Sequence, residues 1–187
     1  MPRANEVLYP RQVWSAAGRF RLGPAVLTSS RMNPPARLVV FQVEDGRYAV
    51  HLAEVERVVA AVELAPLPDS PPMVLGVFNL QGRVIPALDL RRRLGLAARE
   101  LGVSDQLLVV RAAGRVLALV TNRVEGIVEF AAAEVVPAAD VVPELPGVEG
   151  VLRRPDGVVV IHDLARFLSV EEGLRLDAAR GRLAATA

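Results

Sequence analysis

A segment of fifteen residues occurs twice in this chain, and the repeat constrains the fold more than any other feature. Gly76–Leu90 is matched by Gly150–Leu164: each copy opens on Gly-Val and closes on Asp-Leu, with the Asp at the same distance from the first Gly (76 to 89, 150 to 163). A second pair, Gly46–Val59 and Gly114–Val128, precedes these copies in the same order. Internal repeats of this kind reveal the architecture. They indicate a duplicated β-module, with two related halves of about 70 residues (114 − 46 = 68, 150 − 76 = 74).

Short apolar runs separated by turn residues predict β-hairpins in both halves. The hairpins are expected at 38–52, with Asp45-Gly46 at the turn, and at 76–88, 106–121 and 151–162. Proline-rich connectors are expected at 64–72 and 134–146. Repeated short strands of this kind favour closed or nearly closed barrels. Ser169 and Glu172 have the spacing of a capping box, which predicts a C-terminal helix that ends near Arg182. The expected fold class is all-β with minor α.

The first 36 residues differ from the rest of the chain. They show no sustained hydrophobic period, and their five Arg and one Glu give a charge of +4. We expect residues 1–36 to form a disordered extension; a basic arm that touches an anionic surface is the alternative, and a natural start at Met32 is a third. The patterned body is expected at 37–175, and residues 176–187 form the end of the C-terminal helix and a frayed tail.

Composition narrows the classes of function. The chain has no Cys, which excludes disulfides and thiolate metal sites. The net charge of +1 leaves about −3 for the body after the +4 of the N-terminal segment, which argues against a nucleic-acid-binding face. No apolar run approaches the ~20 residues that span a bilayer, so we expect no direct membrane insertion and a soluble, intracellular body.

Residues for catalysis or metal binding are sparse. His51 and His162 are the only imidazoles, and both lie in β-patterned runs. Asp89 and Asp163 precede short helices at matched repeat positions, so they are expected to cap those helices rather than act as paired acids. The run Arg91–Arg93 is expected to be a solvated charge run rather than an anion site. Nucleotide-binding and nucleophile-elbow motifs are missing. We expect no cofactor, no metal and no enzymatic activity.

The segment Gly76–Arg91 resembles the core signature of CheW-like domains, the coupling proteins of bacterial chemotaxis. Phe41-x-Val43, Val55-x-x-Val58 and Val160–Leu164 fall in the order typical of that family, and the likeness spans about 37–175. The resemblance implies two intertwined five-stranded β-barrel subdomains. It also implies a non-catalytic, cytoplasmic adaptor, recruited to membrane-associated receptor arrays. Such an adaptor joins the cytoplasmic tips of methyl-accepting chemoreceptors to the regulatory domain of a CheA-type histidine kinase.

The resemblance also implies a partner-binding groove on this chain. Its expected residues are Val55, Arg57, Gly76, Asn79, Gln81, Gly82, Val124 and Ile127. The sequence departs from the family pattern at three places. Gln81 stands where Arg is usual, Arg57 where an acid is common, and Thr121-Asn122 where Val-Asp is frequent. These departures put the identity of the partner in question more than the fold.

Two alternatives to a two-partner adaptor stay open. One is a decoy that binds a single partner, or a scaffold in a specialised pathway. The other is a ligand-sensing or enzymatic groove between the barrels. That groove would require His51, His162, Asp89 and Asp163 to meet in one pocket.

Overall fold

The structure is a computed structural model that describes residues 36–141 and 147–186. The described residues all belong to one compact unit, Asn33–Ala187. The extension expected at 1–36 lies outside the described residues except for Ala36, which opens the first strand.

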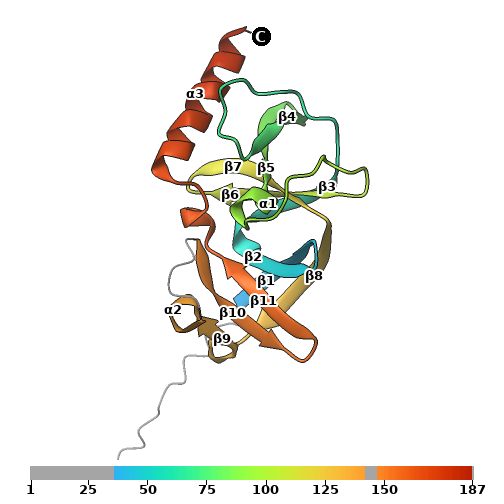
Figure 1. Cartoon of the computed structure of the whole chain (residues 1–187), viewed down its shortest axis with the longest axis vertical. Helices are drawn as coiled ribbons and strands as arrows, with labels where there is room; N and C mark the ends of the chain where they lie inside the picture. The colour runs from blue at the N-terminus through green and yellow to red at the C-terminus, as the bar shows by residue number, and fades with distance from the viewer. Residues whose placement is uncertain (1–35, 142–146, 187) are drawn as a thin grey trace, which may run out of the picture. The chain divides into compact units, whose positions relative to one another are not determined.

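Strands make up about half of the described chain (Figure 1). They are β1 (Ala36–Val43), β2 (Gly46–His51), β3 (Val55–Ala60), β4 (Val74–Leu80), β5 (Arg83–Asp89), β6 (Gln106–Ala112), β7 (Arg115–Thr121), β8 (Arg123–Phe130), β9 (Val135–Pro137), β10 (Val148–Arg154) and β11 (Gly157–His162). The helical elements are η1 (Leu52–Glu54), α1 (Leu90–Arg93), η2 (Ala132–Glu134), α2 (Ala138–Val141), η3 (Leu164–Arg166) and α3 (Val170–Thr186). The predicted class, mostly β with minor helices and a C-terminal helix, is confirmed.

The two sequence halves exchange strands between two sheets. One sheet has the order β3-β6-β7-β5-β4, and the other has the order β8-β1-β2-β11-β10-β9. By the sequence repeat, β1, β2 and β3 correspond to β6, β7 and β8, and the hairpin β4–β5 corresponds to β10–β11. Each sheet therefore joins the first hairpin of one half to the remaining strands of the other. The parallel pairs β5 with β7 and β11 with β2 occur at this junction, because neither pair belongs to a single half.

Two details of the predicted strands are wrong. The first hairpin turns at Glu44-Asp45, with Glu44 at φ 54°, while Gly46 already pairs with Val43. Within the expected connector 134–146, Val135–Pro137 forms β9 against β10. This strand gives its sheet six strands where five were expected. β9 is the edge strand of this sheet, and Pro137 is tolerated there because the outer side of an edge strand needs no N–H donor.

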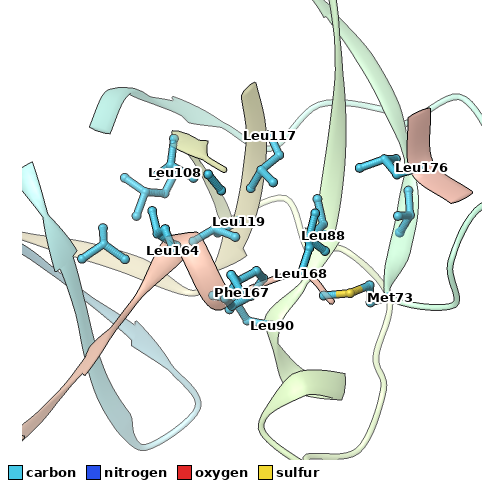
Figure 2. Close-up of a cluster of buried hydrophobic side chains, with 14 of the residues drawn as sticks. Met73, Leu88, Leu90, Leu108, Leu117, Leu119, Leu164, Phe167, Leu168 and Leu176 are labelled. Carbon is cyan, nitrogen blue, oxygen red and sulfur yellow. The ribbon is translucent and has the colours of Figure 1, made fainter. Parts of the chain in front are cut away.

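Side-chain alternation along the strands builds three apolar clusters. On β1, Val39 and Phe41 enter a core shared by both sheets, whereas Leu38 and Val40 enter a core within their own sheet. Alternation of this kind lets a strand pack on both faces. The strand β6 divides its side chains in the same way between the shared core and the core of the five-stranded sheet. The shared core, drawn in Figure 2, holds the two sheets together.

The C-terminal helix α3 packs on the shared core through Leu176 and Ala179. Its start is the predicted capping box: the N–H of Ser169 donates to the Glu172 carboxylate (2.8 Å), and the N–H of Glu172 donates to Ser169 Oγ (3.1 Å). The ion pair of Asp177 with Arg115 (2.7 Å) fixes the helix alongside the five-stranded sheet (Figure 1). The helix continues to Thr186, four residues beyond the expected end.

Candidate functional site

The tip of the β4–β5 hairpin is a tight two-residue turn. Gln81 and Gly82 both have positive φ (54° and 84°), the backbone of a type I′ turn. Asn79 Oδ1 accepts a hydrogen bond from the N–H of Gly82 (2.8 Å), which fixes the turn from inside. The predicted site residues Asn79, Gln81 and Gly82 therefore act locally as one unit, and the Gln81 side chain is exposed.

Arg57 on β3 reaches this tip. Its Nη1 donates to Gln81 Oε1 (3.3 Å), although β3 and β4 lie at opposite edges of the sheet. Next to this contact, Glu56 accepts from Arg83 at the start of β5 (3.0 Å). The sheet must therefore curl until its β3 edge meets the β4–β5 hairpin. The structure thus brings Arg57, Asn79, Gln81 and Gly82 together.

The surface around this tip carries excess positive charge. Glu56 is its central anion and pairs with Arg83 (3.0 Å) and Arg111 (2.8 Å). The hydrogen bond from Arg83 lowers the pKa of Glu56, with help from the charges of both arginines against the opposing effect of burial. Arg83 and Arg111 hold this carboxylate, and Arg57 adds a third guanidinium group at the neighbouring contact with Gln81. We call Arg57, Gln81, Arg83 and Arg111 the cationic tip.

Gly76 lies near the start of β4, where another backbone segment approaches closely. A Cβ at Gly76 would sit 2.5 Å from the carbonyl oxygen of Ala65, and the Gly76 φ is 156°. Ala65 bridges to Val77, so the proline-rich connector runs directly against β4 at this point. Gly150 makes the equivalent approach in the second half, where a Cβ would sit 2.7 Å from the carbonyl oxygen of Val136. The repeated Gly therefore marks a close backbone crossing.

The remaining predicted site residues are spread over both sheets. Val55 at the start of β3 and Val124 on β8 are half-buried and pack against the shared core. Ile127, also on β8, is 59% exposed. The β8 strand edges the six-stranded sheet, and its Val124 and Ile127 match Val55 and Val58 of β3 by the repeat. These two residues are therefore the counterparts of the β3 residues in the other sheet.

The six-stranded sheet has a matching network on its own β8 strand. Glu125, the counterpart of Glu56, accepts from Arg47 Nη2 on β2 (2.6 Å) and from the side-chain amide of Gln42 (2.7 Å). Arg47 also donates to Asp156 in the β10–β11 turn (2.8 Å). In both halves a Glu on an edge strand therefore links that strand to a guanidinium group. The duplication extends from the backbone to the surface charges.

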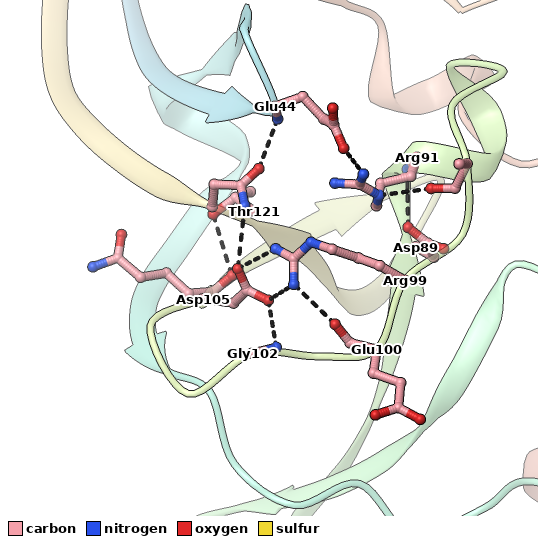
Figure 3. Close-up of polar contacts among 11 residues, drawn as sticks. Glu44, Asp89, Arg91, Arg99, Glu100, Gly102, Asp105 and Thr121 are labelled. Atoms are coloured by element: carbon pink, nitrogen blue, oxygen red, sulfur yellow. Dashed lines mark hydrogen bonds and ion pairs between the residues drawn. The ribbon is translucent and has the colours of Figure 1, made fainter.

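A buried polar network joins the two sheets at their seam (Figure 3). Asp105 is 1% exposed and accepts from both terminal nitrogens of Arg99 (2.8 and 2.5 Å). Burial raises the pKa of Asp105, but the hydrogen bonds from Arg99 and from the N–H of Gly102, together with the charges of Arg99 and Arg91, hold the pKa below its usual range. Arg91 is also buried and pairs with Glu44 of the β1–β2 turn.

This network corrects the expectation of a solvated run at Arg91–Arg93. Arg91 Nε donates to the carbonyl of Ala97 (2.9 Å), and Arg93 pairs with Glu172 (3.2 Å) and lies over the Phe167 ring. Of the three, Arg92 alone is largely exposed. No sequence pattern marks Arg91 or Asp105 as buried, because the two sheets must meet before Glu44 reaches Arg91 and, through Asn122, Asp105.

Asn122, one of the departures from the family pattern, belongs to the same network. Its Oδ1 accepts from the N–H of Glu44 (2.7 Å), and its Nδ2 donates to Asp105 Oδ1 (3.3 Å). An amide can satisfy a donor and a carboxylate together, whereas an Asp would place a second carboxylate beside Asp105. The adjacent Thr121 is 1% exposed and donates to the carbonyl of Gln106 (3.2 Å).

The four residues that a ligand-sensing or enzymatic groove would require have separate structural roles. Asp89 and Asp163 are N-caps, as predicted: Asp89 accepts from the N–H of Arg91 (3.0 Å), and Asp163 accepts from the N–H of Ala165 (2.9 Å). His162 is buried between the Tyr48 and Phe167 rings, and this burial lowers its pKa.

His51 has a different partner from His162: its Nε2 is hydrogen-bonded to the Glu149 carboxylate (2.7 Å). Over residues 36–141 and 147–186, no three His, Asp or Glu side chains are grouped as a metal site requires. Over the same residues, no helix combines the length and hydropathy needed to span a bilayer.

Comparison with known proteins decides the family. The family model described as the CheW-like domain matches residues 37–172. The chain belongs to the CheW-like domain family. The chemotaxis protein CheW of Rhizobium meliloti is 31% identical over 58% of this chain and 70% of its own length. Protein FrzA of Myxococcus xanthus is 29% identical over 74% of this chain and 82% of its own length.

A solved CheW-like structure confirms the fold. The scaffolding protein TtCheW from Thermoanaerobacter tengcongensis superimposes with a TM-score of 0.67 at 25% identity, covering 74% of this chain and 95% of its own. The resemblance drawn from Gly76–Arg91 is therefore confirmed. The CheW-like match ends at residue 172, so most of α3 lies beyond it.

Proposed function

We propose that this CheW-like protein is a non-catalytic adaptor of chemotaxis-type signalling. It would join the cytoplasmic tips of chemoreceptors to the regulatory domain of a CheA-type histidine kinase, in the cytoplasm at a receptor array. The match to the CheW-like domain over 37–172 carries this proposal. It is supported by relatives that are themselves named chemotaxis proteins and by the shared fold with a scaffolding protein.

The cationic tip is the proposed receptor-facing surface. It combines an exposed, rigid turn with exposed guanidinium groups, and such groups select partners by charge complementarity more than they raise affinity. Arg57 and Gln81, two of the departures from the family pattern, are hydrogen-bonded to each other (3.3 Å). The cation is thus present at the tip, supplied by β3 rather than by the turn. A receptor that carries carboxylates at the matching position fits this surface.

A double exchange tests the surface without breaking the contact. In Arg57→Glu, Gln81→Arg, donor and acceptor change places, so the side chains at 57 and 81 can still hydrogen-bond. Both positions are exposed, so we expect the stability to change by less than about 0.5 kcal/mol. The local charge falls, and binding to the native receptor tips should weaken in a pull-down. The control is Arg153→Glu, which reverses the charge of an exposed guanidinium group on β10, away from the tip.

The pull-down compares the native receptor tips with those of a standard chemotaxis receptor. Equal binding of the double variant and the wild type to both would show that the cationic tip lies outside the interface. The adaptor proposal could survive that result on another surface. A single-partner decoy differs in a separate respect, since it would bind receptor or kinase but never both. The comparable likeness to CheW and to FrzA is consistent with a specialised pathway for the same adaptor fold.

A further inference from the structure

A second exposed surface lies beyond the C-terminal end of β3, away from the Arg57–Gln81 contact. It is a groove of about 430 Å³ formed by residues 61–64, Leu75 and residues 100–103. We call it the apolar groove. None of the residues predicted from the sequence as a partner site lines it. It joins the segment after β3 to the loop before β6.

The groove exposes large apolar side chains to solvent. Val103 is fully exposed (100%), and Val62 is 44% exposed. Leu64, Leu75 and Leu101 are half-buried and pack against the core of the five-stranded sheet, so the floor of the groove continues that core. Contiguous apolar surface on a folded protein commonly marks an interaction site.

The exposed Val103 is held on a rigid turn. The N–H of Asp105 donates to the carbonyl of Gly102 (3.0 Å), and the N–H of Gly102 donates back to the Asp105 carboxylate (2.7 Å). Arg99 clamps the same carboxylate from the other side (Figure 3). The carbonyl of Asp105 also accepts from the N–H of Ala61 (3.0 Å), which ties the turn to the opposite wall. A preorganised side chain loses little entropy when it is bound.

The charges at the groove are all negative. Glu63 and Glu100 are exposed and are the only ionisable residues that line it. Neither carboxylate forms an ion pair with the described residues, and the neighbouring Arg99 is committed to Asp105. An occupant that covers the leucines would bring these two carboxylates into its interface. A cationic group on the occupant would compensate the negative charge of these two carboxylates.

We propose that the apolar groove binds a segment of a partner protein that presents aliphatic side chains beside Arg or Lys. The groove and the cationic tip lie on one sheet but carry opposite charge. They therefore select chemically different partners. This inference adds a second binding surface to the proposed adaptor, and it rests on the groove itself rather than on the assignment of the tip.

The test uses the full chain and labelled helical peptides of matched length. One peptide carries a leucine stripe flanked by Arg, the second replaces Arg by Glu, and the third replaces Leu by Ser. Fluorescence anisotropy should show saturable binding of the first peptide alone, weakened by salt because the charge pairs lie at an exposed rim. No binding of the first peptide, or equal binding of the Glu peptide, overturns the proposal.

Substitutions then locate the bound peptide. Val103→Ser and the double change Glu63→Gln, Glu100→Gln should each weaken binding at least about fivefold, the level that marks residues carrying binding energy. The controls are Val158→Ser, which alters another exposed valine (55%), and Glu171→Gln, which alters an exposed acid on α3. Equal losses in the controls would overturn the assignment.

Two further readouts keep the outcomes distinct. All four variants change exposed side chains, so their melting temperatures should match the wild type; if Val103→Ser unfolds, the double Gln variant decides alone. Sedimentation of the free chain identifies another occupant, because self-association that Val103→Ser abolishes would place a second copy in the groove and overturn the proposal. A failed pull-down at the cationic tip would leave the peptide result unaffected.

Discussion

The ion pair of Arg99 with Asp105 should contribute more to stability than any surface pair of the same type. Asp105→Asn removes the negative charge while keeping the shape of the side chain. The carboxylate is 1% exposed and accepts from Arg99 twice and from the N–H of Gly102. Hydrogen bonds to a charged group contribute about 1.5–3 kcal/mol each. One acceptor survives in Asn, and the Arg99 side chain, 35% exposed, can rehydrate. We therefore expect a loss of about 2–3 kcal/mol.

The pH dependence gives this prediction a second readout. Because the pKa of Asp105 is lowered in the folded protein, its stabilisation is present above the unfolded-state pKa of about 3.9 and is lost as the pH falls through the folded pKa. In urea titrations, the gap between wild type and Asp105→Asn should be constant from about pH 5 to 8 and should narrow below about pH 4.

The matched control is Asp177→Asn, which breaks the exposed pair with Arg115 and should cost about 0–1 kcal/mol. An Asp105→Asn loss no larger than that of the control, or a gap that does not narrow in acid, would refute the argument from burial.

Two further predictions concern packing. Leu88→Ala should cost about 2–5 kcal/mol, because Leu88 is fully buried in the shared core, whereas Val84→Ala, at 43% exposure, should cost less than about 1 kcal/mol; equal denaturation midpoints would contradict this. Gly76→Ala and Gly150→Ala should each cost about 1–3 kcal/mol, since each Cβ would press on a backbone carbonyl. Gly181→Ala in α3, where nothing lies within 4 Å, should instead stabilise the protein by up to about 1 kcal/mol. A Gly150→Ala variant as stable as the wild type would show that the two crossings are not equivalent.

Local features of this fold could be predicted from the sequence because neighbouring residues determine them. The caps at Asp89 and Asp163 and the box from Ser169 to Glu172 each involve residues two or three positions apart. The Gln81-Gly82 turn is equally local. Patterns of this range are read directly from residue types.

Features that depend on the exchange of hairpins could not be predicted from residues alone. The repeat shows two similar halves, but similar strands can pair within a half or between halves. The burial of Arg91 and Asp105 depends on contact between the two sheets. Arg91 pairs with Glu44 of the β1–β2 turn, and Asn122 joins Asp105 to the same turn. The contact between Arg57 and Gln81 requires the sheet to curl, which no spacing in the sequence reveals. No sequence pattern indicates the apolar groove, because Val103 does not lie in a run with hydrophobic periodicity.

The measurement that tests the central claim most directly is assembly of a ternary complex. The full chain is mixed with native receptor tips and with the regulatory domain of the native kinase, first singly and then together, and the complexes are separated by size. A two-partner adaptor should bind each partner alone and hold both in one complex with one copy of each. Competition between the partners would identify a single-partner decoy, and binding to neither would contradict the proposed function itself.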